Sequence, residues 1–174
     1  MGADRAIHVN DPSAENSDSL GLAKILAAVG AQENPDIIFA GLMSDDGNHS
    51  AVPPMLSELM GLPSATGVLK AERQESSMRV ERELEGGALE VVDLPLPCLV
   101  AVQSGSNQVR YASLKGIMQA KKKPLDVKTT ADLGLNGQVG GDAAKVKIEK
   151  IYVPAKSDSA EMIEGSTAEV TSQL

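Results

Sequence analysis

The residues with the most local chemistry form an acidic loop, Gly41 to Ser50, with the sequence G-L-M-S-D-D-G-N-H-S. The loop follows the apolar run I-I-F-A-G, which is typical of a central parallel strand, and it precedes a helix predicted at about residues 51–60. Ligands of α/β sheets bind at the carboxyl ends of such strands, and the N–H groups of a helix N-terminus attract phosphate. The loop is therefore a candidate site for a phosphate or nucleotide.

The polar side chains of this loop suit that chemistry. Ser50 could cap the helix or hydrogen-bond a phosphate oxygen, and Asn48 and His49 could donate further hydrogen bonds. Asp46 could hold a ribose hydroxyl. The same residues also fit an ordinary Asp/Asn/Gly turn in which Ser50 acts only as the N-cap. The loop residues alone leave both interpretations open.

Patterns for catalysis or metal binding are missing from the sequence. Asp45 and Asp46 are adjacent, so their side chains diverge in an extended loop instead of converging on a substrate. His8 and His49 lack the spacing of metal ligands, and no nucleophile-elbow or phosphate-loop motif occurs. The single cysteine, Cys98, lies in an apolar run where burial would leave it inert. We expect no catalytic residue and no metal site, which argues against a hydrolase or kinase.

A second stretch, R-Y-A-S-L-K-G-I-M-Q-A-K-K-K-P at residues 110–124, combines apolar and basic residues. Leu114, Ile117 and Met118 have i, i+3, i+4 spacing, which predicts a short helix with a small apolar face and a positive rim. Such a face suits docking onto a partner, with an aliphatic anchor for affinity and lysines for orientation. The spacing fits equally well a helix that packs on its own domain.

Periodicity predicts the elements that position these residues. A strand is expected at residues 6–9, followed by a helix capped by Asp18 or Ser19 and ended by Gly30. With the strand before Gly41, these two elements predict one right-handed βαβ unit. The apolar positions of the first helix are Leu22, Ile25, Leu26 and Val29. Gly61 is expected just past the end of the second helix.

From residue 65 the pattern changes to strands. Residues 66–72 and 78–85 predict a hairpin, and a turn at Gly86-Gly87 leads into a strand at 88–94. Arg82 falls on the inward-facing phase of this hairpin. Further strands are predicted at 99–102 and 145–153, and the start of a helix at 169–174.

Length and composition exclude several classes of protein. The chain has 174 residues, 16 Lys+Arg against 24 Asp+Glu, a net charge of −8 and 42% hydrophobic residues, which suits one domain. The negative charge and the low aromatic content of 2% argue against a nucleic-acid partner. No apolar stretch approaches the roughly 20 residues that a membrane-spanning helix needs, so we expect no membrane insertion.

Taken together, these stretches resemble the β subunit of electron transfer flavoprotein. The resemblance is carried by M-G-A-D-R-A-I-H-V at residues 1–9, D-x-N-x-S at 46–50, V-E-R-E-L-E-G-G at 80–87, the basic stretch at 110–124 and D-L-G-L at 132–135. The pattern R-Y-x-x-L-x-x-I-M-x-A-K-K-K is quite specific. The resemblance covers residues 1–135 well and extends more loosely to residue 153.

The resemblance implies an α/β fold, namely a parallel-sheet, adenine-nucleotide-binding (Rossmann-like) domain with an added antiparallel hairpin, incomplete at its N-terminus. Residues 1–153 would form this domain, and residues 154–174 a partly flexible C-terminal arm that is cut short. The family's fold begins with a strand-helix-strand-helix segment before M-G-A-D, and its arm wraps the α subunit. The chain is accordingly expected to be an internal fragment or the product of a misplaced start.

The resemblance also implies a function without independent catalysis. The chain would form a heterodimer with an α subunit that holds most of one FAD, and would itself bind AMP, or a second FAD as in bifurcating relatives. The flavin would accept electrons from acyl-CoA or other flavin dehydrogenases and pass them to a membrane quinone oxidoreductase. The location would be the bacterial cytoplasm or the mitochondrial matrix. A stand-alone adenine-nucleotide-binding stress or sensor module and an inactive fragment are the alternatives.

Carried over by position, the resemblance assigns three sets of residues. The nucleotide set is Gly41, Leu42, Asp46, Asn48, His49 and Ser50. The dehydrogenase-recognition set is Arg110, Tyr111, Leu114, Ile117 and Met118, with Leu114 as the anchor. The set facing the mobile flavin domain is Arg82 and Glu83. The chain departs from the family pattern at His49, where glutamine is common, at Gln119, where lysine is frequent, and in a loop about two residues shorter than in some members.

Overall fold

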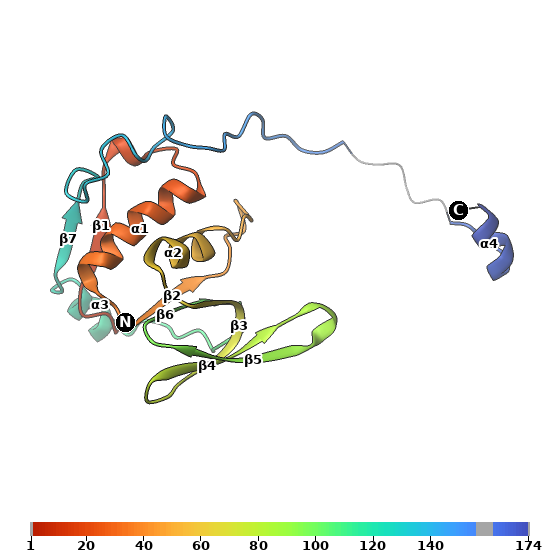
Figure 1. Cartoon of the computed structure of the whole chain (residues 1–174), viewed down its shortest axis with the longest axis horizontal. Coiled ribbons are helices and arrows are strands. Elements are labelled where there is room, and N and C mark those ends of the chain that lie inside the picture. The colour runs from red at the N-terminus through yellow and green to blue at the C-terminus, as the bar shows by residue number, and fades with distance from the viewer. Residues whose placement is uncertain (1, 156–161, 174) are drawn as a thin grey trace.

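The computed structural model describes residues 2–155 and 162–173, and Figure 1 shows their arrangement. The helices and strands are, in chain order, β1 (Ala6–Val9), α1 (Ser19–Glu33), β2 (Ile37–Gly41), α2 (Val52–Met60), β3 (Ser64–Arg73), β4 (Ser77–Glu83), β5 (Leu89–Pro95), β6 (Cys98–Val102), α3 (Leu114–Ala120), β7 (Leu125–Lys128) and α4 (Thr167–Gln173). Short 3₁₀ turns lie at Pro12–Ala14 and Glu85–Gly87. The mixture of helices and parallel strands confirms the predicted α/β class.

The strands form two separate sheets. Five strands pair in the order β2-β6-β3-β4-β5, with β2, β6 and β3 parallel and β3, β4 and β5 antiparallel. The added antiparallel hairpin is therefore confirmed. β1 pairs in parallel with β7, from Ala6 opposite Leu125 to Val9 opposite Lys128. The prediction of one βαβ unit is wrong, because β1 and β2 pair with strands distant in sequence and lie in different sheets.

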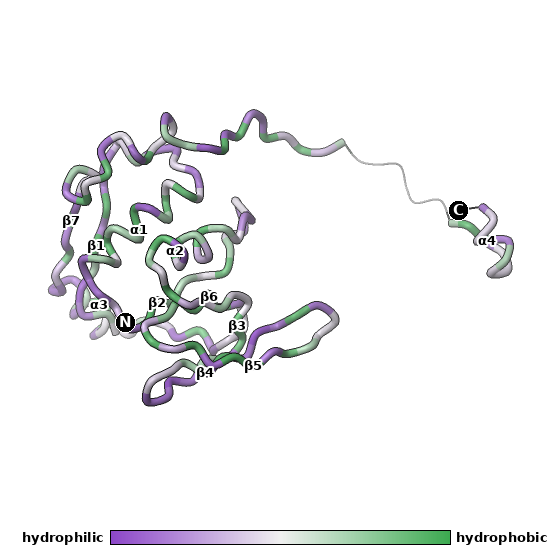
Figure 2. The backbone as a smooth tube through the Cα atoms, in the orientation of Figure 1, coloured by the Kyte–Doolittle hydropathy of each residue, from purple (hydrophilic) through white to green (hydrophobic). Residues whose placement is uncertain are grey.

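The core lies on both faces of the five-stranded sheet. β6 is its central parallel strand, and four of its five residues, Cys98–Ala101, are fully buried. Cys98 and Val100 pack with residues of the hairpin, whereas Leu99 and Ala101 pack against Ala23 of α1 and Leu56 of α2. A strand covered on both faces has this continuous apolar sequence. In Figure 2 the turn between β3 and β4 is hydrophilic, as expected for an exposed hairpin tip.

The first helix begins as predicted and ends later than predicted. Asp18 is the N-cap and accepts a hydrogen bond from the Gly21 N–H. The helix continues through Gly30 to Glu33 and ends at Asn34, whose backbone is left-handed with φ 48°. The prediction that Gly30 ends the helix is wrong, and Gly30 instead lies where α1 meets α2. A Cβ atom there would lie 2.8 Å from Cε of Met60, so glycine allows α2 to approach.

Other elements were predicted with mixed success. The hairpin strands, β6, α3 and the C-terminal helix occur near their predicted positions, and Gly61 ends α2 with φ 64°. The predicted strand at residues 145–153 is wrong, since this stretch is extended but pairs with no described strand. β7 was not predicted. The wrong strand at 145–153 and the unpredicted β7 have the same cause. A strand forms only by pairing with the backbone of a neighbouring strand, and its own sequence does not specify that neighbour.

Candidate functional site

The acidic loop leaves the sheet at the position that the sequence predicted. Gly41 ends β2 opposite Val102 of β6, and the Leu42 N–H donates to the Val102 carbonyl oxygen at 3.1 Å. Two parallel strands thus end together where the loop begins, which is the edge where α/β sheets bind ligands. From residue 43 to residue 49 the loop is exposed to solvent.

Within the loop, the acidic side chain serves a local turn. The Asp46 carboxylate accepts the Gly47 N–H at 2.7 Å, and the Asn48 N–H donates to the Ser44 carbonyl at 3.0 Å. Hydrogen bonds from the Ser44 hydroxyl and the Gly47 N–H hold the pKa of Asp46 below its usual range. This is the Asp/Asn/Gly turn considered as the alternative. Asp46 remains exposed, so a ligand could still reach its carboxylate.

The entry to α2 differs from the prediction. Its N-cap is Ala51 without a side-chain hydrogen bond, so Ser50 does not cap the helix. Pro53 and Pro54 occupy the second and third helical positions, where an N-cap side chain would find its N–H donors. Because proline has no N–H, a phosphate at this helix start would meet few backbone donors. Ser50 instead has a left-handed backbone with φ 50°.

The remaining polar groups of the loop are partly available. His49 Nδ1 lies 3.5 Å from the Ser19 hydroxyl, so the loop reaches the first turn of α1. Among the residues that the structure describes, the side chains of Asn48 and Ser50 have no hydrogen-bond partner. Three groups that can donate hydrogen bonds therefore lie within three consecutive positions at the carboxyl end of β2.

The basic stretch forms the predicted short helix, and its apolar face is exposed. Ser113 caps α3 by accepting the Gly116 N–H at 3.1 Å. Leu114 is 83% exposed and Tyr111 is 91% exposed, and Met118 and Ile117 are also accessible. Single exposed apolar residues are common on protein surfaces, whereas a group of them on neighbouring turns is typical of a contact surface. Among the described residues, Leu114 and Met118 are mostly uncovered, whereas Ile117 is 44% exposed and so partly covered.

The hairpin places Arg82 and Glu83 in different environments. Arg82 is half-buried, as its phase predicted, and Nε donates to the Thr66 carbonyl at 3.0 Å while Nη1 lies 3.3 Å from Glu90. Glu83 is exposed and accepts a hydrogen bond from Gln103 Nε2 at 2.7 Å. Gln103 directly follows β6, so Glu83 lies at the same edge of the sheet as the start of the acidic loop. Sequence reasoning missed Gln103, which belongs to no motif.

Comparison with known proteins connects these features. The family described as the electron transfer flavoprotein domain matches residues 1–133. The chain belongs to this family. It is 36% identical to the electron transfer flavoprotein subunit beta of Methylophilus methylotrophus over 99% of the chain and 66% of that protein. It is 34% identical to the subunit beta of Bacillus subtilis over 100% of the chain and 67% of that protein. It is 35% identical to the mitochondrial subunit beta of Arabidopsis thaliana over 94% of the chain and 62% of that protein. The chain therefore spans about two thirds of the length of these relatives.

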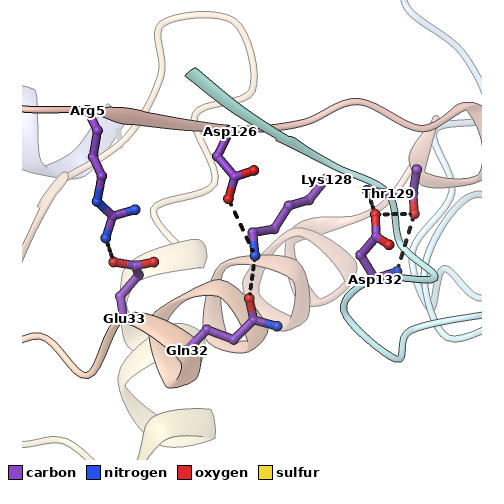
Figure 3. A network of polar contacts seen from close by, with 7 residues as sticks. All are labelled: Arg5, Gln32, Glu33, Asp126, Lys128, Thr129 and Asp132. Carbon is purple, nitrogen blue, oxygen red and sulfur yellow. Dashed lines mark hydrogen bonds and ion pairs between the residues drawn. The ribbon is translucent and has the colours of Figure 1, made fainter. Parts of the chain in front are cut away.

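In this member of the electron transfer flavoprotein family, the D-L-G-L motif has a structural role. Asp132 accepts hydrogen bonds from the N–H and the hydroxyl of Thr129, both at 2.7 Å, which closes the turn after β7 (Figure 3). Lys128 of β7 donates to Gln32 near the end of α1 at 2.7 Å. Arg5 pairs with Glu33 beside it. These contacts fasten the β1–β7 sheet to α1.

A further carboxylate lies next to this motif. Asp11, just after β1, accepts hydrogen bonds from the Ser13 N–H at 2.9 Å and from the N–H and hydroxyl of Thr130 at 2.8 and 2.7 Å. These bonds hold the pKa of Asp11 far below its usual range. No motif marks Asp11, because its partner is distant in sequence. The interaction joins the end of β1 to the loop after β7.

Three further features of this family member bear on its chemistry: the cysteine, possible metal ligands and helix hydrophobicity. Burial raises the pKa of the Cys98 thiol, which keeps it protonated and unreactive. Among residues 2–155 and 162–173, no three His, Cys, Asp or Glu side chains are grouped so that they could hold a metal ion. None of the helices in those ranges combines the length and the apolar character needed to cross a bilayer.

Proposed function

We propose that the chain acts as the β subunit of an electron transfer flavoprotein, an electron carrier without catalysis of its own. It pairs with an α subunit that holds most of the FAD. The flavin receives electrons from acyl-CoA or related flavin dehydrogenases, and an electron transfer flavoprotein-quinone oxidoreductase in the membrane receives them in turn. The observation that carries this proposal is the 83% exposure of Leu114 within a segment that matches the family's specific motif.

The geometry of α3 suits transient docking. Leu114 is the first helical residue, and Ile117 and Met118 lie one turn later on the same side. Lys115 and Lys121–Lys123 surround this apolar group with positive charge. An apolar anchor supplies affinity in a small interface, while the lysines orient an acidic partner and speed its approach. Arg110 and Tyr111 extend the same exposed surface. A carrier that must leave each dehydrogenase quickly needs such a small contact.

The acidic loop is proposed to hold the phosphate of AMP or, in its place, a second FAD within a Rossmann-like domain. Asn48, His49 and Ser50 provide the donors, and Gly41 and Leu42 place the loop at the end of β2. The Asp46 carboxylate could accept a ribose hydroxyl from its exposed position. The unused side chains of Asn48 and Ser50 support this assignment, whereas the two prolines of α2 limit the backbone donors. The phosphate would therefore be held mainly by side chains.

Arg82 and Glu83 are proposed to face the flavin-bearing domain of the α subunit. Glu83 suits this role because its carboxylate is exposed, and the Gln103 amide holds it in one orientation. Arg82 suits it less well, since its guanidinium already bonds Thr66 and Glu90. Arg82 would then act by holding the hairpin in shape. Because the Arabidopsis relative is named mitochondrial, the matrix is the expected location in a eukaryote and the cytoplasm in a bacterium.

The central experiment tests docking through Leu114. The chain is coexpressed with an α subunit of the family, and reduction of the bound flavin by an acyl-CoA dehydrogenase is measured. Leu114→Ala is expected to slow that reduction about 10-fold without changing flavin content, because it removes an interface anchor. Leu59→Ala is the control, since Leu59 is an exposed leucine on α2 that belongs to none of the proposed sites. A colourless complex with the parent chain, or equal effects of the two variants, would contradict the proposal.

Calorimetry separates the nucleotide hypotheses. AMP, FAD and ATP are titrated separately into the purified chain and into its complex with the α subunit. Binding of AMP or FAD supports the nucleotide assignment. Tight binding of ATP by a chain that has no affinity for the α subunit would favour a stand-alone nucleotide sensor instead.

A further inference from the structure

A segment near the C-terminus crosses the start of α1 and is fastened there. We call residues 138–146 the strap. The Gly140 N–H donates to the Ser17 hydroxyl at 2.9 Å, and the Gly141 N–H donates to the Glu15 carbonyl at 3.0 Å. A Cβ atom on Gly140 would lie 2.2 Å from the Ser13 carbonyl oxygen, so only glycine allows this approach.

The last fastening of the strap is the carboxylate of Asp18. Its Oδ1 accepts the Gly21 N–H at 2.8 Å and so caps α1. Its Oδ2 accepts the N–H groups of Lys145 at 2.6 Å and Val146 at 3.2 Å. The two oxygens of one side chain thus have separate tasks, one in the helix and one in the strap. Hydrogen bonds from Gly21 and from the strap keep the pKa of Asp18 below its usual range.

Beyond Val146 the described chain leaves the domain. Residues 147–155 are extended and make no hydrogen bond to any other described element (Figure 1). Val146, Ile148, Ile151 and Val153 are all more than 60% exposed. Within residues 147–155, Lys147 and Lys150 outnumber Glu149, so this stretch carries a net charge of +1, whereas the whole chain carries −8. An extended, apolar and basic stretch suits contact with a partner protein rather than with its own acidic domain.

We propose that Asp18 is a positioning residue that fixes where the C-terminal stretch leaves the domain, and so presents residues 147–153 to a partner subunit. One oxygen keeps α1 capped while the other holds the strap. The stretch then starts from a fixed point, and less conformational entropy is lost when it binds. The identity of the partner as the α subunit rests on the proposed function. The clamp itself rests only on the contacts of Asp18.

Two substitutions separate the tasks of Asp18. Asp18→Asn keeps a good N-cap, but its amide offers only one acceptor oxygen, and its NH₂ group faces either the strap or the helix. In Asp18→Ser, the single hydroxyl oxygen still caps the helix. The serine side chain is too short to reach the strap as well. Asp142→Asn is the matched control, because it removes the same charge within the strap and Asp142 makes no hydrogen bond to another described residue.

Amide hydrogen exchange by NMR gives the direct readout. In Asp18→Ser, the Lys145 and Val146 amides are expected to exchange about 10-fold faster, with the Gly21 amide nearly unchanged. Trypsin should cut faster after Lys145 and at the parent rate after Lys150, which is already free. Asp142→Asn should leave all these rates unchanged. Unchanged exchange at Lys145 and Val146, or an equal acceleration at Gly21, would overturn the proposal.

Binding to an α subunit tests the consequence of the clamp. Asp18→Ser is expected to weaken the complex about 10-fold, while Asp142→Asn keeps the parent affinity. If the parent chain binds no α subunit, the proposed function fails, whereas the exchange rates still decide the clamp. If the parent and Asp18→Ser bind equally although exchange has changed, the presenting role is overturned.

Discussion

The two sheets of this molecule are held together by different forces. In the five-stranded sheet, Val68, Val80, Leu99 and Val100 are completely buried, and the sheet is covered by helices on one face. In the two-stranded sheet, neither β1 nor β7 contains a buried residue. That sheet is fastened mainly by side-chain hydrogen bonds and ion pairs through Asp11, Lys128 and Arg5. Among the described residues, its one contact with a buried apolar cluster is made by Val9, which packs against Ile25, Leu135 and Val139.

This difference indicates that the two sheets differ in the free energy that stabilises them. Apolar burial scales with area and holds the five-stranded sheet as one cooperative unit. Hydrogen bonds fix geometry but contribute less net free energy, because water competes for the same groups. We therefore expect the two-stranded sheet to open separately from the rest. Substitutions in the two regions should differ in size and in the strands that they affect.

The largest effect is expected in the buried centre of β6. Leu99→Ala leaves a cavity between the sheet and α1 and α2, and should lower the free energy of unfolding by about 3 kcal/mol. Chemical denaturation followed by circular dichroism measures this loss. Leu125→Ala on β7 is the control, because Leu125 is 60% exposed and its truncation should cost below about 1 kcal/mol. Equal losses would remove the distinction between the sheets.

A smaller and more local effect is expected at Asp11. Asp11→Ala leaves the N–H of buried Thr130 without its acceptor, while the Thr130 hydroxyl keeps the Ser13 hydroxyl as a partner at 2.7 Å, so stability should fall by less than in Leu99→Ala. Hydrogen exchange should accelerate in β1 and β7 and remain unchanged in β6. Asp11→Asn, which keeps one acceptor, should lie between the parent and the alanine variant. Acceleration in both sheets would mean that they open together.

Acid should act on the same anchors. Hydrogen bonds depress the pKa values of Asp11 and Asp132 below the ordinary value of 3.8. A depressed pKa in the folded state adds stability that is complete above the unfolded value and lost as pH falls through the folded one. Exchange in β1 and β7 should thus rise relative to β6 between pH 5 and pH 3, after correction for intrinsic rates. A constant ratio would show that these carboxylates do not hold the smaller sheet.

The same contrast explains what could be predicted from the sequence. The hairpin strands, β6 and the start of α1 follow from local periodicity and capping, and these predictions are confirmed. α1 continues past Gly30 to a left-handed Asn34, and Ser50 has a left-handed backbone before the N-cap Ala51, so neither residue follows its local rule. Local rules fail where a neighbour decides the outcome.

The polar anchors could not be predicted for a related reason. Asp11 and Thr130 are 119 residues apart, and Asp18 and Lys145 are 127 apart. Nothing in the sequence pairs them, because such bonds depend on the finished topology. Within the candidate site, the place of the acidic loop at the end of β2 followed from the strand pattern. The exposure of Leu114 did not, since helical spacing is the same for a docking face and a packed face.

The smallest effect is expected at an ion pair on the outer face of the five-stranded sheet. Arg79 and Asp93 lie opposite each other on β4 and β5 and form two hydrogen bonds of 2.8 and 2.7 Å, but both side chains are about half exposed. Water and salt screen exposed pairs, so Arg79→Ala should change the free energy of unfolding by roughly a tenth of the Leu99→Ala effect. Denaturation at low salt and in 0.5 M NaCl (about 4 Å screening length) measures it. A loss as large as that of Asp11→Ala would mean that polar contacts stabilise both sheets, and that burial alone does not set them apart.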